Sequence, residues 1–219
     1  MNDRTGSVSN AWRGAWADRA FRLQALVTVP LLVLILSLLA RFLEANEARQ
    51  GVVLADPLLA LFQPHDLTWI TFGLIYIGLV AGIVFLLRHP ATLLLAIQAY
   101  ALMVGFRILA MTLVPLEPPP AMIPLNDPLV EIFGTGRLLT KDLFFSGHTS
   151  TLFLLFLVMP PGRLKTVFLV CTLLVACCVL LQHVHYSIDV FVAPFVAYAS
   201  VRIVRTLTSR AEIARPTHV

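Results

Sequence analysis

The sequence predicts an all-α integral membrane protein, a bundle of six transmembrane helices with both termini in the cytoplasm. Of the 219 residues, 58% are hydrophobic and only 13% are charged, which lies outside the balance of a soluble domain of this length. A bilayer span needs roughly 20 apolar residues. Six runs approach that length, near residues 22–43, 68–87, 91–114, 143–160, 166–184 and 187–206. We therefore expect one membrane domain over 23–206, between an N-terminal segment, 1–22, and a tail, 207–219.

The distribution of Lys and Arg predicts the orientation of the spans. If the N-terminus is inside, most of the basic residues fall in inner segments: Arg4, Arg13, Arg19, Arg22, Arg88, Arg163, Lys165, Arg202, Arg205, Arg210 and Arg215. Because inner loops of membrane proteins carry this excess, we expect both termini in the cytoplasm. The net charge of +4 follows from the same bias, and no basic and aromatic pattern predicts nucleic-acid binding. No short apolar run with a cleavage site precedes the first span, so we expect no signal peptide.

The segment before the first span predicts a helix that lies on the inner membrane surface. Ser9 or Asn10 is a candidate N-cap. One face then carries Trp12, Trp16, Ala20 and Leu23, with the arginines largely off it, as in an interfacial helix. The alternative is a disordered basic tail.

Two outer loops are expected to contain short helices, and the cysteines are expected to be packing residues. In the first loop, Asp56 and Pro57 start a helix that Pro64 stops. In the second loop, Asp127 caps a helix that Gly134 ends. Three cysteines lie in the fifth span without partners at zinc-site spacing: Cys171, Cys177 and Cys178.

Four ionisable side chains lie where the predicted topology brings them to one level near the outer leaflet. They are Arg107 in GFRILAMTLVP, His148 in DLFFSGHTSTLF, and His185 and Asp189 in HVHYSIDV. Charge inside a bilayer is costly, so such groups usually face each other or a wet cavity and carry function. We therefore expect a functional site at the outer ends of the last four spans.

The chemistry of these groups favours phosphoryl-type transfer. His185 and Asp189 are four residues apart, so on a helix Asp189 can accept a hydrogen bond from one imidazole nitrogen and leave the other as a nucleophile. His148 would supply a second imidazole to protonate a leaving oxygen. Arg107 would stabilise the phosphate oxygens.

Several alternatives stay open from the residues alone. The histidine and aspartate pair could be structural. A metal site could form from His183, His185, Asp189 and His148. Arg107 could instead pair with a carboxylate or a lipid phosphate. Gly147 could serve only close helix packing.

The stretches KDLFFSGHT and HVHYSIDVFVAPFVAY resemble the sphingomyelin synthase family, a branch of the type 2 phosphatidic acid phosphatase superfamily. The element RILAMTLVPLEP is also similar, and the resemblance covers Arg107 to Arg205. It implies six spans, an exoplasmic site, His185 as nucleophile assisted by Asp189, and His148 acting on the leaving group. We place Ser146, Gly147 and Tyr186 beside Arg107 as phosphate-binding residues, and we expect supporting roles for Glu131, Asp142 and His183. Neither a metal nor a cofactor is expected.

The resemblance also implies a reaction. A phospho-headgroup would pass from a phosphatidylcholine- or phosphatidylethanolamine-type donor to ceramide or another lipid alcohol, leaving diacylglycerol. Phosphatases of the superfamily carry a Lys-x6-Arg-Pro element and a Ser-Arg pair, but here Cys178 and Val179 take the places of that pair and Arg215-Pro216 is in the tail. A lipid phosphatase or phospholipase C-like hydrolase is the alternative, followed by a non-catalytic lipid-binding or scrambling protein. The compact chain looks bacterial, so we expect an inner-membrane protein with a periplasmic site.

Overall fold

The structure, a computed structural model, describes residues 3–125 and 139–213. Within these ranges it contains seven α-helices and one 3₁₀ turn, and no strand longer than an isolated bridge. The elements are α1 (Asp3–Ala17), α2 (Arg19–Glu47), η1 (Leu59–Leu61), α3 (Thr68–Leu86), α4 (Pro90–Leu113), α6 (Gly147–Val158), α7 (Arg163–Leu181) and α8 (Ser187–Ile213). The expectation of an all-helical membrane protein is confirmed at this level.

Five helices are long and apolar enough to cross a membrane: α2, α3, α4, α7 and α8. The fourth expected span contains only the 12-residue helix α6, about 18 Å long at 1.5 Å per residue. The helix begins four residues after the start of the expected apolar run at residue 143, where Ser146 caps it and accepts a hydrogen bond from the Thr149 amide. All six predicted apolar runs therefore contain a helix, and five of these helices have spanning length.

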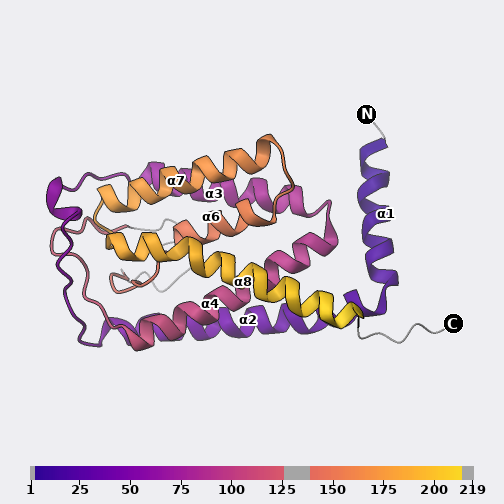
Figure 1. Ribbon diagram of the computed structural model, residues 1–219, viewed down its shortest axis with the longest axis horizontal. Helices are drawn as coiled ribbons and strands as arrows, with labels where there is room; N and C mark the ends of the chain where they lie inside the picture. The colour runs from indigo at the N-terminus through magenta and orange to yellow at the C-terminus, as the bar shows by residue number, and fades with distance from the viewer. Residues whose placement is uncertain (1–2, 126–138, 214–219) are drawn as a thin grey trace.

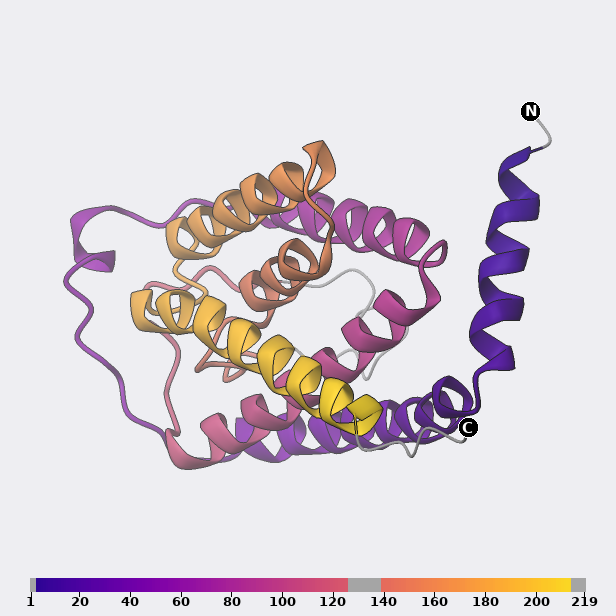
Figure 2. The ribbon, with the colours of Figure 1, turned by 45° about the vertical axis from the view of Figure 1, so that its right-hand side comes forward.

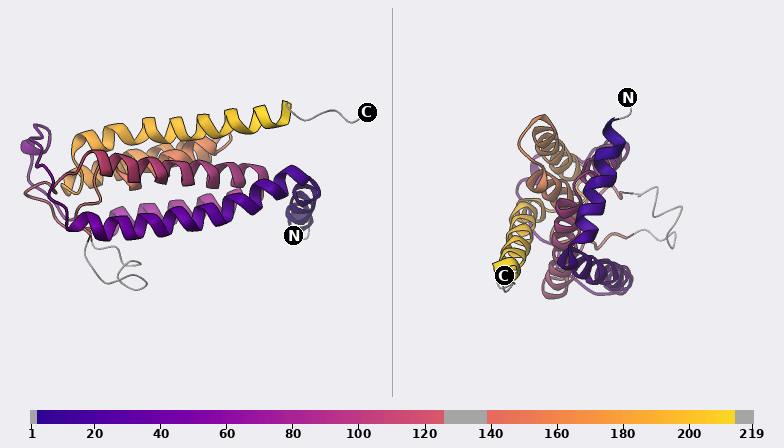
Figure 3. Two further views of the ribbon diagram at one scale, coloured as in Figure 1. Left: turned by 90° about the horizontal axis from the view of Figure 1, so that it is seen from below. Right: turned by 90° about the vertical axis from the view of Figure 1, so that its right-hand side faces the viewer.

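The helices form an elongated bundle with its long loops at one end (Figure 1). Helix α1 and the C-terminal end of α8 lie at the opposite end, together with the α3–α4 and α6–α7 turns. Helix α1 lies across the bundle axis (Figure 3), and its Trp12 donates a hydrogen bond of 2.7 Å from Nε1 to the Leu87 carbonyl. The predicted N-cap at Ser9 or Asn10 is wrong, since α1 starts at Asp3 and both residues lie inside it.

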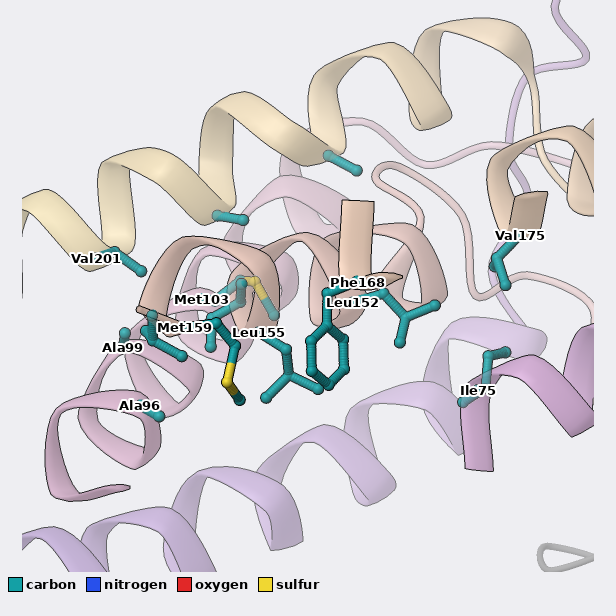
Figure 4. Packing of buried hydrophobic residues seen from close by; sticks show 14 of the residues in the cluster. Ile75, Ala96, Ala99, Met103, Leu152, Leu155, Met159, Phe168, Val175 and Val201 are labelled. Carbon is teal, nitrogen blue, oxygen red and sulfur yellow. The ribbon is translucent and has the colours of Figure 1, made fainter. Parts of the chain in front are cut away.

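Helix α6 lies at the centre of the bundle and packs against α3, α4, α7 and α8. Figure 4 shows the core from close by, with Leu152 and Leu155 of α6, and Met159 directly after it, facing residues of the neighbouring helices. Glycines let α3 approach, because a Cβ added at Gly78 would lie 2.9 Å from Leu152 Cδ2 and one at Gly82 would lie 3.0 Å from Leu155 Cδ1. This packing fixes the depth of α6, and with it the position of the SGHT motif at its start.

The first loop expected on the outer side, between α2 and α3, crosses the end of the bundle that carries the SGHT motif. Figure 2 shows it running from the end of α2 around to α3. The predicted short helix is present only as the single turn η1, and Asp56 starts that turn by accepting hydrogen bonds from the amides of Leu58 and Leu59. Val52 pairs with Leu116 in an isolated parallel bridge that ties the loop to the end of α4. The helix expected at 127–134 lies outside the described residues.

The three cysteines are free thiols on α7. Cys178 is buried and Cys171 is half-buried, which fits packing residues, whereas Cys177 is exposed on the outside of the bundle.

Candidate active site

The structure brings residues from four places in the chain to one end of the bundle. Arg107 comes from α4, and residues 146–148 form the start of α6. The turn between α7 and α8 contributes residues 183–186, and Asp189 lies in the first turn of α8. The convergence predicted from topology is therefore present, and its geometry can be taken residue by residue.

The His185 imidazole pairs with the Asp189 carboxylate in the interior of the protein. Nδ1 of His185 lies 3.3 Å from Oδ2 of Asp189, and the two side chains are only 2% and 0% exposed. The same carboxylate oxygen accepts a hydrogen bond of 3.2 Å from the Tyr186 amide. His185 precedes α8, so the pair forms across the start of the helix and not along one helical face. With a proton on Nδ1, this contact leaves Nε2 as the basic nitrogen.

His148 places a second imidazole beside the first. It is the second residue of α6, and its ring centre lies 6.4 Å from that of His185, with 63° between the ring planes. Phe72 from α3 also packs against His148, with ring centres 6.2 Å apart and 77° between the ring planes. The two imidazoles are too far apart to bond to each other but near enough to act on one substrate group.

Arg107 lies directly over Gly147. A Cβ added to this glycine would fall 1.5 Å from Arg107 Nη1, so no larger residue fits while the guanidinium stays in place. Gly147 is the first residue of α6, whose free amides form the positive end of the helix dipole. The guanidinium and the helix start therefore present positive charge from the same place, which is an arrangement suited to a phosphate.

Asp142 partly neutralises this charge. Its Oδ2 lies 2.7 Å from Arg107 Nη2, and the side chains are 30% and 13% exposed. The N–H direction is not aligned for a hydrogen bond, and within the described ranges the buried Arg107 Nε also has no hydrogen-bond partner. The alternative in which Arg107 pairs with a carboxylate is thus realised in the structure.

The remaining predicted site residues that the structure describes lie close by, but their side chains make contacts other than those predicted. Ser146 is fully buried and caps α6, and its amide donates to the Asp189 carbonyl. The Tyr186 hydroxyl donates to the Glu117 carbonyl and accepts from the Leu54 amide, so it is engaged with the loops that follow α4 and α2. His183 has a positive φ of 57° and packs against Phe62. Glu131 lies outside the described residues.

A set of polar contacts behind Asp142 was not predicted from the sequence. Glu47, at the end of α2, accepts hydrogen bonds from the amides of Thr140 and Lys141 at 2.6 and 2.7 Å. Lys141 Nζ in turn lies 2.8 Å from Glu117 Oε1. The hydrogen bond from Lys141, with another from the Gly51 amide, lowers the pKa of Glu117. The only local signal is the neighbouring position of Lys141 and Asp142, which does not specify these partners.

The described residues contain no group of three or more His, Cys, Asp or Glu side chains placed to hold a metal ion. His183, which the metal alternative requires, packs its ring against Phe62, with 5.3 Å between ring centres.

Comparison with curated proteins finds no match to this chain. In the comparison with protein families, residues 141–206 match the family described as PAP2 superfamily C-terminal. The matched region covers less than a third of the chain but includes His148, His185 and Asp189. It supports the type 2 phosphatidic acid phosphatase superfamily, and with it an enzyme that acts on lipid phosphates in the membrane.

Proposed function

We propose that the protein is a membrane-embedded lipid phosphotransferase that moves a phospho-headgroup from a glycerophospholipid to a lipid alcohol such as ceramide. The observation that carries the proposal is the asymmetry of the two imidazoles, since His185 is backed by a buried carboxylate at 3.3 Å whereas His148 stands at the start of α6 beside Arg107. One imidazole is thus oriented to attack, and the other is placed to move protons.

The proposed reaction has two steps. In the first, Nε2 of His185 attacks the donor phosphorus, the bond from phosphorus to the diacylglycerol oxygen breaks, and His148 protonates that oxygen. Diacylglycerol leaves, and the headgroup phosphate stays on His185. In the second, His148 takes the proton of the acceptor hydroxyl, whose oxygen attacks phosphorus and breaks the bond to Nε2.

The remaining residues would stabilise the charges of the reaction and orient the reacting groups. Asp189 keeps the proton on Nδ1 and stabilises the imidazolium that develops during attack, as in other carboxylate and histidine pairs. Arg107 and the amides at the start of α6 would hold the non-bridging phosphate oxygens.

The charge balance favours a phosphodiester donor over a phosphomonoester. A phosphodiester carries one negative charge, whereas a phosphomonoester approaches two near neutral pH. Arg107 is paired with Asp142, and the positions that bear the Ser-Arg pair in superfamily phosphatases hold Cys178 and Val179, both buried in α7. We therefore propose phosphatidylcholine- or phosphatidylethanolamine-type donors. The superfamily match favours a lipid phosphatase or phospholipase C-like hydrolase as the second candidate.

Topology is part of the proposal. The end of the bundle away from the site carries Arg88 in the α3–α4 turn, and Arg163 and Lys165 at the start of α7. Since basic residues mark the cytoplasmic side, we propose an inner-membrane protein with cytoplasmic termini and a periplasmic site. The α6 region would complete a sixth crossing together with residues 139–146, and α1 would lie on the cytoplasmic leaflet.

The test is a product analysis. Purified protein in vesicles receives phosphatidylcholine, phosphatidylethanolamine or phosphatidic acid, each with ceramide, diacylglycerol or no acceptor, and the lipids are identified by mass spectrometry. We expect headgroup transfer from a diester donor, with none in the His185→Gln variant. Release of inorganic phosphate from phosphatidic acid as the main reaction would favour the hydrolase.

A further inference from the structure

The start of α8 is held by a carboxylate from a distant part of the chain. The amide of Ser187, the first residue of α8, donates a hydrogen bond of 2.7 Å to Oδ2 of Asp56 in the first outer loop. His185 lies two residues before this contact and Asp189 two residues after it. The contact therefore acts on the short stretch that carries the proposed nucleophile and its partner.

Asp56 is itself fixed in the loop. Its Oδ1 accepts hydrogen bonds of 3.0 and 3.2 Å from the amides of Leu58 and Leu59. Leu59 is buried in a small hydrophobic cluster with Leu116, Leu143 and Tyr186. Partial burial raises the pKa of Asp56, but the hydrogen bonds from Ser187 and the two leucine amides outweigh it and leave the pKa below its ordinary value. The carboxylate is therefore charged at neutral pH and anchored on both oxygens.

Two carboxylates accept hydrogen bonds from different groups at the start of α8. The first amides of a helix have no partners within it. Asp189, in the first turn, turns its Oδ2 back to the Tyr186 amide and the His185 ring. Asp56 supplies the acceptor for the Ser187 amide from outside the helix, which leaves Asp189 to orient the imidazole.

We infer that Asp56 is a positioning residue for the reaction: through Ser187 it fixes the start of α8 and so holds His185 in line for attack. The inference rests on the proposed role of His185 as the nucleophile. Nucleophilic attack depends steeply on geometry, and a displacement of about 1 Å can lower a rate by about a hundredfold.

Other contacts hold the rest of the turn, so the loss of Asp56 should shift His185 without unfolding the bundle. The Tyr186 hydroxyl bonds to Leu54 and Glu117. Gln182, fully buried, accepts a hydrogen bond from the Leu67 amide and donates one to Thr68 Oγ1.

The chain offers a matched control at Asp66. This aspartate lies in the same loop, and its Oδ1 accepts a hydrogen bond of 3.0 Å from the Thr68 amide at the start of α3. It therefore has the same residue type and the same kind of helix contact as Asp56, on a helix that carries none of the proposed catalytic residues. In Asp56→Asn, the side chain keeps only one acceptor oxygen. It therefore loses either the hydrogen bond from Ser187 or those from Leu58 and Leu59 that anchor it in the loop, and in both cases the link between the loop and the start of α8 is weakened.

The first readout is kinetic. We expect Asp56→Asn to lower kcat by about tenfold or more with KM little changed, because geometry and not lipid binding is affected. Asp66→Asn should change kcat by no more than about twofold. Equal kcat losses in the two variants would overturn the inference.

The second readout does not need a known substrate. The rate at which diethyl pyrocarbonate modifies His185 is followed by peptide mass spectrometry on the full-length protein in detergent, with His65 as an internal reference. We expect a severalfold higher rate at His185 in Asp56→Asn and an unchanged rate in Asp66→Asn. If wild-type protein acts on no lipid tested but this selective change is found, Asp56 does hold His185 in place and it is the proposed function that fails. An unchanged His185 rate in Asp56→Asn would overturn the inference, whatever the activity.

Discussion

The guanidinium of Arg107 occupies the space that a side chain on Gly147 would need. The Cβ of an alanine would lie 1.5 Å from Nη1 and 2.4 Å from Cζ of Arg107. Because Arg107 is a flexible side chain, it can move aside and leave the backbone of α6 intact, but it then no longer lies over the start of this helix. The absence of a side chain at Gly147 therefore leaves the space that the guanidinium occupies.

This relationship predicts the effect of Gly147→Ala. We expect at least a tenfold loss of headgroup transfer with a melting temperature near that of the wild type, since one displaced charge-assisted contact is worth about 1.5 to 3 kcal/mol. Gly105→Ala on α4 is the matched control, because the nearest atom to its added Cβ is Ile35 Cδ1 at 4.0 Å. That variant should keep its activity. Full activity in Gly147→Ala would remove Arg107 from the proposed phosphate site.

The ion pair between Arg107 and Asp142 predicts a change in substrate preference. In Asp142→Asn the guanidinium loses its counter-charge at 2.7 Å, so a dianionic phosphate should be accepted more readily. We expect the ratio of kcat/KM for phosphatidic acid to that for a diester donor to rise by about tenfold. Competition assays with both lipids in one vesicle measure the ratio directly. A ratio that stays constant would mean that Asp142 does not influence the choice between the two donor classes.

The proposed topology predicts the accessibility of two engineered cysteines. In a background without Cys171, Cys177 and Cys178, an impermeant maleimide applied to intact cells should label Ala55→Cys and not Ser209→Cys. Both positions are exposed, at opposite ends of the bundle. After lysis both should react, which controls for reactivity. The reverse pattern in intact cells would put the site in the cytoplasm.

The contact between Glu117 and Lys141 predicts how the end of the bundle that carries the candidate site responds to acid. The pKa of Glu117 is lowered below its ordinary 4.5, with the Lys141 hydrogen bond as the largest cause. A carboxyl whose pKa is lower in the folded than in the unfolded state adds stability above its unfolded pKa, and this contribution is lost as the pH falls through the folded value. Thermal unfolding in detergent between pH 6 and 3 should therefore depend less on pH in Glu117→Gln than in the wild type. Glu44→Gln, an exposed position on α2, is the control and should follow the wild type.

Hydropathy and local spacing predicted the elements that depend on neighbouring residues. Each apolar run contains a helix, since a span must satisfy its own backbone groups. The spacing of His185 and Asp189 predicted their contact, although the contact forms at the helix start. The start of α6 was placed too early, because Leu143, Phe144 and Phe145 are as apolar as the helix that follows and hydropathy does not separate extended from helical chain.

The contacts that support the site could not be predicted in the same way. Asp56 and Ser187 are 131 residues apart, and Glu47 and Thr140 are 93 apart. Such pairs are set by how the loops fold back over the end of the bundle, and no periodic pattern encodes them. For Arg107, the sequence left a phosphate and a carboxylate as alternatives, and the structure pairs it with Asp142 while its Nε stays without a hydrogen-bond partner in the described part of the chain.

The most direct test of the account is the identity of the residue that carries the headgroup phosphate. Wild-type protein in vesicles is given a diester donor labelled in its headgroup, without acceptor, and is quenched at neutral to alkaline pH before peptide mass spectrometry. We expect the label on His185, released when ceramide or diacylglycerol is added before the quench. The label should be absent in His185→Gln. It should be present in His183→Gln, because the ring of His183 packs against Phe62. Label on another residue, or headgroup transfer that persists in His185→Gln, would contradict the account.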